Sequence, residues 1–322
     1  MRKNWLLKAG LVLASAGILA GCSGESKAEG DGTVNLGILQ LMDHESLNAS
    51  REGFLDVLED AGYIEGENLN VDYQNAQLDQ SNLQTMSERL SGQNDLILAI
   101  ATPAAVSLAN VDQETPILFT AITDPVDADL VASLDAPGGN LTGTTDAGPL
   151  EEQIALLLSL TTNPTHIGII YNSSEPNSVI QGDQATELLE AAGVKVVLKT
   201  VSSTNEVQQA MESLAGDVQG IYVPTDNTLA STMGSVKQVA EANKLPVVAA
   251  STDQVKAGGL ATYGIDYYEL GRQTGEMALE IIEEGADPAT MPIQSSEVLD
   301  LVVNEEVAKA LGIDPASITV PE

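Results

Sequence analysis

From Val34 onward, short apolar segments alternate with amphipathic helical stretches along almost the whole chain. This alternation is the strongest constraint on the fold, because it is typical of a mostly parallel sheet with helices packed on both faces. The same order of segments then occurs a second time. The sequence therefore predicts an α/β protein that contains two similar doubly wound lobes.

The individual segments follow from the apolar periodicity. In the first half we predict strands and helices alternately at 34–41, 47–61, 69–73, 80–90, 96–100, a helix from about 103, and strands at 117–121 and 140–145. In the second half the corresponding order is 166–171, 178–192, 194–200, 205–214, 220–223, 229–243, 246–250 and 259–264. Corresponding strands are separated by roughly 120 to 132 residues. The second lobe is thus expected to repeat the strand order of the first.

The chain is strongly acidic, with 47 Asp and Glu against 13 Lys and Arg among 322 residues, and a formal net charge of -34. Affinity for nucleic acid comes mostly from Lys and Arg side chains that neutralise phosphates, so nucleic acid is not an expected partner. The acidic residues are spread along the chain rather than clustered. They are consistent with a solvated, soluble surface, and adaptation to salty or alkaline surroundings remains open.

The N-terminal segment differs in character from the rest. Arg2, Lys3 and Lys8 precede the apolar run 9–20, and the small residues Ala20 and Gly21 follow it. This pattern predicts a signal peptide over 1–21, too short to span a membrane. Residues 22–33 are rich in Gly, Ser, Glu and Ala, which predicts a flexible tether.

Cys22 is the single cysteine of the chain and stands directly after the small-residue pair. The run Leu19-Ala20-Gly21-Cys22 resembles the lipobox of bacterial lipoproteins, in which the cysteine sulfur is acylated. It implies lipidation at Cys22 and a membrane-anchored protein on the extracytoplasmic face of the cell membrane. An ordinary secretory peptide with an incidental cysteine is the alternative. With one Cys, no disulfide can form within the chain.

Polar residues are concentrated where the predicted strands end. In open parallel sheets ligands bind beyond the carboxyl ends of the strands, where loops and helix N-termini converge. The segments at these ends are rich in Thr, Asp, Asn and Tyr, and they are 40–44, 101–103, 120–124, 146, 171–178, 224–228, 251–253 and 263–268. A ligand site is therefore expected between the two lobes.

Several of these segments together resemble a known family. They are Ile38-Leu39-Gln40, Asp43-His44, Ala101-Thr102-Pro103-Ala104-Ala105, Ala121-Ile122-Thr123-Asp124-Pro125-Val126 and the run from Gly264 to Gly271. Their order and spacing are similar to those of ABC transporter substrate-binding proteins, whose characterised members include tryptophan- and tyrosine-binding lipoproteins. The resemblance extends from about Val34 to Ile318.

The resemblance implies the type I periplasmic-binding-protein fold, in which three crossings join two lobes around a ligand. Lobe one would comprise 34–145 and 265–292, and lobe two 146–264 and 293–322. The crossings would then fall near Asp146, Gly264 and the pair Met291-Pro292. Closure of the lobes about this hinge is the expected motion.

The function implied is that of the solute-binding component of an ABC importer, which captures a small solute, here an amino acid and possibly an aromatic one. It would deliver the solute to a membrane permease driven by an ATPase, as a monomer and without cofactor or metal. Two alternatives stay open: a sugar or nucleoside binder of the same fold, and a lipid-anchored sensor that serves a signalling receptor. No nucleophile elbow, zinc motif or phosphate-binding loop indicates an enzyme.

An amino acid ligand is a zwitterion, so its site needs donors for the carboxylate and acidic acceptors for the ammonium. Thr102, the backbone N–H of Ala104, and Thr123 are the carboxylate candidates, because a helix N-terminus after Thr102-Pro103 favours an anion. Thr102 could equally be a plain N-cap. Asp226 is the first candidate for the ammonium, followed by Asp266 and Asp124; helix capping or turn formation is the competing explanation for these three.

The remaining candidates lie at other strand ends. His44, Gln40, Ala121 and Asn172 complete the expected set of ligand contacts, and Tyr171 could stack on an aromatic ligand, as could Tyr263. Ordinary packing is the alternative for both tyrosines. His166 begins a strand and is expected to be structural.

Overall fold

The computed structural model describes residues 32–321. The predicted signal peptide, Cys22 and almost all of the predicted tether lie outside these residues. Residues 33–322 form one compact unit. Within the described part of the chain, no helix has the length and apolar character needed to cross a membrane.

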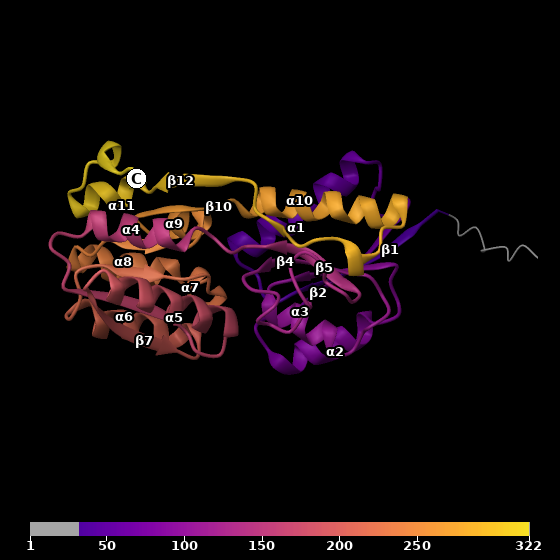
Figure 1. Cartoon of the computed structure of the whole chain (residues 1–322), viewed down its shortest axis with the longest axis horizontal. Helices are drawn as coiled ribbons and strands as arrows, with labels where there is room; N and C mark the ends of the chain where they lie inside the picture. Colours follow the sequence, from indigo (N-terminus) through magenta and orange to yellow (C-terminus); the bar gives the residue numbers. More distant parts are fainter. Residues whose placement is uncertain (1–31, 322) are drawn as a thin grey trace, which may run out of the picture. The chain divides into compact units, whose positions relative to one another are not determined.

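Lobe one is built on a six-stranded sheet in the order β11-β5-β4-β3-β1-β2, in which every pair is parallel. Four helices accompany it (Figure 1). In chain order the elements are β1 (Val34–Gln40), α1 (Glu45–Asp60), β2 (Leu69–Asn75), α2 (Gln80–Leu90), β3 (Leu96–Ile100), α3 (Thr102–Ala109), β4 (Ile117–Ile122), β5 (Leu141–Thr145), α10 (Tyr267–Leu279) and β11 (Gln294–Ser295).

Lobe two contains a second six-stranded sheet in the order β12-β10-β9-β8-β6-β7, parallel except for β12, which runs antiparallel to β10. Its elements are α4 (Leu150–Leu160), β6 (His166–Asn172), α5 (Pro176–Ala191), β7 (Lys195–Val201), α6 (Val207–Ala215), β8 (Ile221–Val223), α7 (Asn227–Ala230), α8 (Met233–Asn243), β9 (Val247–Ala249), α9 (Thr252–Ala257), β10 (Ala261–Ile265), β12 (Leu299–Val303) and α11 (Glu305–Leu311). Short 3-10 or π turns lie at 204–206, 280–284, 288–290 and 315–317.

The two sheets share one strand order, since β2-β1-β3-β4-β5 of lobe one corresponds to β7-β6-β8-β9-β10 of lobe two. The predicted fold of two similar doubly wound lobes is therefore confirmed. Helices α4, α9 and α11 and strands β11 and β12 were not predicted from the sequence, and the helix expected over 229–243 is divided into α7 and α8. The division falls at Ser231 and Thr232, and the Thr232 hydroxyl donates to the carbonyl of Thr228.

The chain passes between the sheets after β5, after β10 and after β11. The first two passages contain Asp146 and Asp266, close to the predicted positions. The third was predicted at 291–292, which is wrong by a few residues, because Gln294 and Ser295 still pair with β5 of lobe one. It therefore lies between Ser295 and Leu299.

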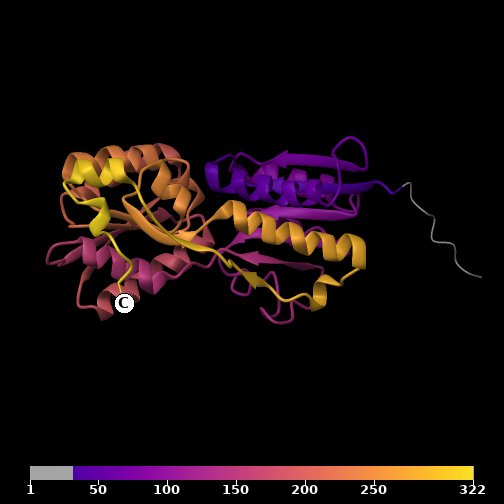
Figure 2. The same ribbon diagram turned by 90° about the horizontal axis from the view of Figure 1, so that it is seen from above.

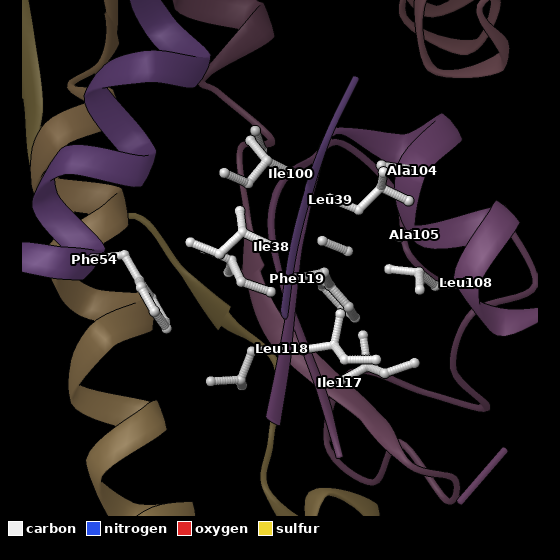
Figure 3. Packing of buried hydrophobic residues seen from close by; sticks show 14 of the residues in the cluster. Ile38, Leu39, Phe54, Ile100, Ala104, Ala105, Leu108, Ile117, Leu118 and Phe119 are labelled. Carbon is white, nitrogen blue, oxygen red and sulfur yellow. The ribbon is translucent and has the colours of Figure 1, made fainter. Parts of the chain in front are cut away.

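The core of lobe one fills both faces of its sheet. Figure 3 shows Phe54 of α1 on one side of the strands and Leu108 of α3 on the other, with Ile38 of β1 and Phe119 of β4 between them. All four side chains are fully buried. Strands covered on both faces read as continuous apolar runs, and this is why β1, β3 and β4 were easily recognised in the sequence.

Helices α1 and α10 lie side by side at backbone contact (Figure 1, Figure 2). A Cβ atom on Gly271 of α10 would lie 2.0 Å from the carbonyl oxygen of Ser50, and one on Gly53 of α1 would lie 2.1 Å from that of Tyr268. These distances are far below van der Waals contact. The two glycines therefore allow α10, which follows the second crossing, to dock on α1.

We expect Gly271→Ala to lower the free energy of unfolding by at least about 2 kcal/mol, since the added methyl meets rigid backbone. Urea denaturation measures this change. Gly234→Ala is the matched control: a Cβ atom on this exposed glycine of α8 would have no other atom within 4 Å, and the substitution is expected to stabilise by roughly 0.4–1 kcal/mol. Equal effects of both substitutions would contradict the close packing of α1 and α10.

Candidate functional site

A small cavity lies between the lobes, at the carboxyl ends of the strands of both sheets. Lobe one contributes His44, Ser46, Leu47 and Ala121, the crossings contribute Asp146 and Tyr267, and lobe two contributes Asn177, Thr225, Asp226, Asn227, Ala230, Ser251 and Gln254. The empty space among these residues is about 310 Å³, including the part open to solvent, but the centre of a water-sized sphere fits into only about 10 Å³ of it. A larger molecule can enter only if the lobes or the lining side chains move.

His44 connects the two lobes across this cavity. It precedes α1 in lobe one, and its Nε2 lies 3.0 Å from the side-chain oxygen Oδ1 of Asn227 in lobe two. Burial lowers the pKa of the His44 imidazole, which favours the neutral ring. Asn227 begins α7, so this bond joins the start of a helix in one lobe to the start of a helix in the other.

Glu175 holds the loop that carries Asn227. Its buried carboxylate accepts hydrogen bonds from the backbone N–H of Asn227 at 3.0 Å and of Thr228 at 3.0 Å. The side chains of Asn227, at 2.6 Å, and of Thr228, at 2.9 Å, donate to it as well, and Asn172 adds a longer contact at 3.5 Å. The carboxylate thus replaces water for the first N–H groups of α7, as expected for an anion at a helix N-terminus.

Asp226 caps the same helix from the other side. It is buried, and its carboxylate accepts from the backbone N–H of Leu229 at 2.7 Å and of Asn172 at 2.6 Å. Burial and the nearby charge of Glu175 raise the pKa of Asp226 well above its ordinary value. Two buried acids therefore lie close together here: Asp226 lines the cavity, and Glu175 lies behind Asn227 outside the lining.

A further buried acid, Asp146, lies at the first crossing. Asp146 is buried and accepts from the hydroxyl of Tyr267 at 2.6 Å and from that of Thr123 at 2.9 Å. Burial raises the pKa of the Asp146 carboxyl. Because Tyr267 follows the second crossing, the Asp146–Tyr267 hydrogen bond ties two of the three crossings together.

Two alanines near the site have unusual backbone conformations. Ala121 in β4 has φ +58°, and Ala101 after β3 has φ +83°. The left-handed region is uncommon for residues other than glycine, and such strain is often found at functional sites. Ala121 lines the cavity, and the register of β4 with β5 shifts between Phe119 and Ile122.

The structure brings together five of the residues predicted from the sequence. His44, Ala121 and Asp226 line the cavity. Thr123 and Asn172 lie directly behind it, where Thr123 donates to Asp146 and the Asn172 backbone donates to Asp226.

The other predicted residues lie outside the cavity lining. Thr102 faces a separate groove that also contains Gln80, Pro103 and Pro176 and whose empty space, including the part open to solvent, is about 590 Å³. Ala104 is buried in the core of lobe one. Gln40 is buried and donates to the carbonyl oxygen of Met42 and to the side chain of Asn48.

Asp226, which caps α7, and three further candidates have the structural roles that were the competing explanations. Asp124 accepts from the N–H groups of Val126 and Asp127 in a turn. Asp266 caps α10 through the N–H groups of Tyr268 and Glu269. Tyr171 packs into the core of lobe two against α5, where a Cβ on Gly182 would lie 2.4 Å from its ring.

Ten residues of the described lining were not among the individual predictions, and neither was Glu175 behind them. Of these, Asp146, Glu175, Asn177, Asn227 and Tyr267 lie in strand-end segments that the sequence had marked as polar. One sequence signal for two of them was Pro176, because proline is favoured in the first turn of a helix and therefore indicates that Glu175 and Asn177 stand at the start of α5.

Among the described residues, no group of three or more His, Cys, Asp or Glu side chains could hold a metal ion.

Comparison with known proteins gives consistent results. The family model for ABC transporter substrate binding proteins matches residues 35–319. A tyrosine-binding protein of Clostridioides difficile (strain R20291) is 42% identical over 284 residues, which cover 88% of this chain and 82% of that protein.

Two solved structures are also similar. The ABC domain from Streptococcus pneumonia in complex with L-Trp has a TM-score of 0.83 at 38% identity, over 90% of this chain and 96% of that chain. A ligand-free, open substrate-binding protein with adhesive properties from Clostridium difficile has a TM-score of 0.68 at 42% identity, over 88% and 96%.

The raised pKa of Asp226 leads to a prediction about pH. A folded-state pKa above the unfolded value means that the folded protein binds the proton more tightly, so this stabilisation is complete below the unfolded pKa of about 3.9 and is lost as the pH rises through the folded pKa. We expect the stability difference between wild type and Asp226→Asn to fall by more than about 1 kcal/mol between about pH 4.5 and about pH 8.5.

Denaturant unfolding of both proteins at several pH values measures this difference. Asp124→Asn is the control, because Asp124 lies in a surface turn. A difference between wild type and Asp226→Asn that stays constant over the whole range would contradict the prediction.

Proposed function

Because this chain belongs to the family of ABC transporter substrate-binding proteins, we propose that it captures an aromatic amino acid, tryptophan or tyrosine, between its two lobes. The observation that carries the proposal is the cavity itself, which both lobes line at the carboxyl ends of their sheets. The similar proteins support the ligand class, since one is described as tyrosine-binding and another was solved with L-Trp.

The lining is suited to a ligand with an apolar ring and polar ends. Leu47, Ala121, Ala230 and the ring of Tyr267 provide apolar surface. Asp226, Asn227, Ser251 and Gln254 provide polar groups from lobe two. A site of this kind orients its ligand through a few placed polar groups and gains affinity from the burial of the ring.

Lobe closure is part of the proposed mechanism. The structure is more similar to the L-Trp complex, at a TM-score of 0.83, than to the ligand-free open protein, at 0.68, although the open protein has the higher sequence identity. This supports a closed arrangement, which agrees with the small free volume of the cavity. The ligand would enter an open form and shift the equilibrium by its higher affinity for the closed one.

The cellular arrangement extends the proposal. Acylation of Cys22 after removal of residues 1–21 would anchor the protein on the extracytoplasmic face of the cell membrane. A monomer would then present its closed form to a permease, and a cytoplasmic ATPase would drive transport. Delivery rather than chemistry is the role of the site.

We expect L-tryptophan or L-tyrosine to raise the melting temperature of the protein more than any other of the twenty amino acids. The physical reason is linkage, since a ligand that binds only the folded state stabilises it in proportion to the logarithm of its concentration over Kd. A thermal-shift panel followed by calorimetry measures this. A panel of sugars and nucleosides is the comparison, and a shift confined to that panel would contradict the proposed ligand class.

The anchor is tested separately. In cells that express the full chain, Cys22→Ser is expected to move most of the protein from the membrane fraction to the soluble fraction, because the acyl chains supply nearly all of the membrane affinity. Quantitative immunoblotting of the two fractions measures the shift. Ser23→Ala is the neighbouring control, and an unchanged distribution of the Cys22→Ser protein would exclude the lipid anchor.

A further inference from the structure

The hydrogen bonds of Glu175 determine which atom donates and which accepts in the bond between Asn227 and His44. A carboxylate can only accept, so the side-chain NH₂ of Asn227 must face Glu175. The Asn227 oxygen Oδ1 then faces His44 and can only accept, so His44 Nε2 must carry a proton. In the neutral imidazole the other nitrogen, Nδ1, is therefore an acceptor.

This acceptor is buried and has no hydrogen-bond partner among the described residues. The same is true of a second atom of the cavity lining, Oδ1 of Asn177 in lobe two. The orientation of Asn177 is also fixed, because its NH₂ donates to the carbonyl of Thr225 at 2.9 Å and contacts the Ser178 hydroxyl at 3.3 Å. Asn177 is only 4% exposed.

The two carboxylates that line the cavity do not provide free acceptors of this kind, whereas Oδ2 of Asp253, next to the lining residue Gln254, is buried without a partner. Both oxygens of Asp226 accept backbone N–H groups, and both oxygens of Asp146 accept hydroxyl groups. No Lys or Arg is among the described residues that line the cavity. The site therefore presents unpaired acceptors from both lobes, and its described lining has no fixed positive charge.

Unpaired buried acceptors are costly, and a ligand that supplies donors removes this cost. A primary ammonium group offers three N–H donors and a positive charge, and the two unpaired acceptors belong to lining residues of different lobes. A ligand carboxylate has only acceptor oxygens and a negative charge, so these two acceptor atoms would repel it. The arrangement thus favours an amine over an acid.

We propose that the site recognises its ligand chiefly through a primary amine, held as an ammonium between His44 Nδ1 of lobe one and Asn177 Oδ1 of lobe two. This inference rests on the proposed function and deepens it, because it names the ligand group that joins the lobes. Glu175 acts through Asn227 as the positioning residue that keeps Nδ1 of His44 free to accept.

The first test compares three ligands that share one ring: L-tryptophan, tryptamine, which lacks the carboxylate, and 3-indolepropionate, which lacks the amine. Calorimetry on the full chain gives Kd for each. We expect loss of the amine to weaken binding at least about tenfold more than loss of the carboxylate, since the amine bonds are charge-assisted. Binding of 3-indolepropionate that equals or exceeds that of tryptamine would overturn the proposal.

The second test uses variants of the two acceptors. His44→Ala and Asn177→Ala are each expected to weaken tryptamine about tenfold and to leave 3-indolepropionate within about twofold of wild type. His44→Gln should recover most of the loss, because Gln offers both a donor for Asn227 and an acceptor. His166→Ala is the matched histidine control, and thermal unfolding checks that each variant is folded. Equal weakening of tryptamine and 3-indolepropionate would show a general loss of closure and contradict the proposal.

The two proposals can fail separately. If the amino acid panel identifies a ligand other than tryptophan or tyrosine, the aromatic class is wrong, and the amine and acid analogues of that amino acid take the place of the indole probes. If aromatic amino acids bind but their amines do not, the proposed function stands and the amine inference is wrong. If no amino acid binds, both are contradicted.

Discussion

The arrangement of the site depends on the burial of Glu175 without a basic partner. Within the described residues, its carboxylate is surrounded by N–H and O–H groups of Asn172, Asn227 and Thr228 rather than by Lys or Arg. A buried charge is tolerated only when hydrogen bonds replace its hydration, and α7 supplies these bonds because its first N–H groups would otherwise be unpaired. A four-residue helix too short to be stable alone is thereby fixed in place.

Because α7 is held in place, its first residues present defined polar groups to lobe one across the cavity. Asn227 presents its oxygen to His44, and Asp226 closes the same helix start while lining the cavity. At the crossings, Asp146 and Tyr267 form a second buried contact. In the proposed mechanism, ligand recognition and lobe closure involve the same few residues, as expected for a protein whose site is completed only when the lobes meet.

Much of the fold could be predicted from the sequence because its signals are local. Strands such as β1 and β3 are buried on both faces, and helices such as α2 have an apolar face, so hydrophobic periodicity was sufficient. Local rules failed where long-range pairing decided the outcome. The short β11 belongs to lobe one because it pairs with β5, about 150 residues earlier in the chain, and nothing within 291–295 indicates this pairing.

The candidate site likewise combines features that local sequence signals predict with features that long-range contacts decide. The sequence by itself determined that two similar lobes form, that their polar strand ends face a common crevice, and that His44, Ala121 and Asp226 stand at those ends, because these properties follow from hydrophobic pattern and parallel topology. Only the tertiary structure decided which polar side chains remain free. Asp124 and Asp266 accept N–H groups of their own turns and helices, and Tyr171 is packed against α5. Among the described residues that line the cavity, the unpaired acceptors belong to His44 and Asn177. The physical reason is that a hydrogen-bonding group can be assigned to ligand only after its partners in the fold are known, and those partners come from segments far apart in the chain.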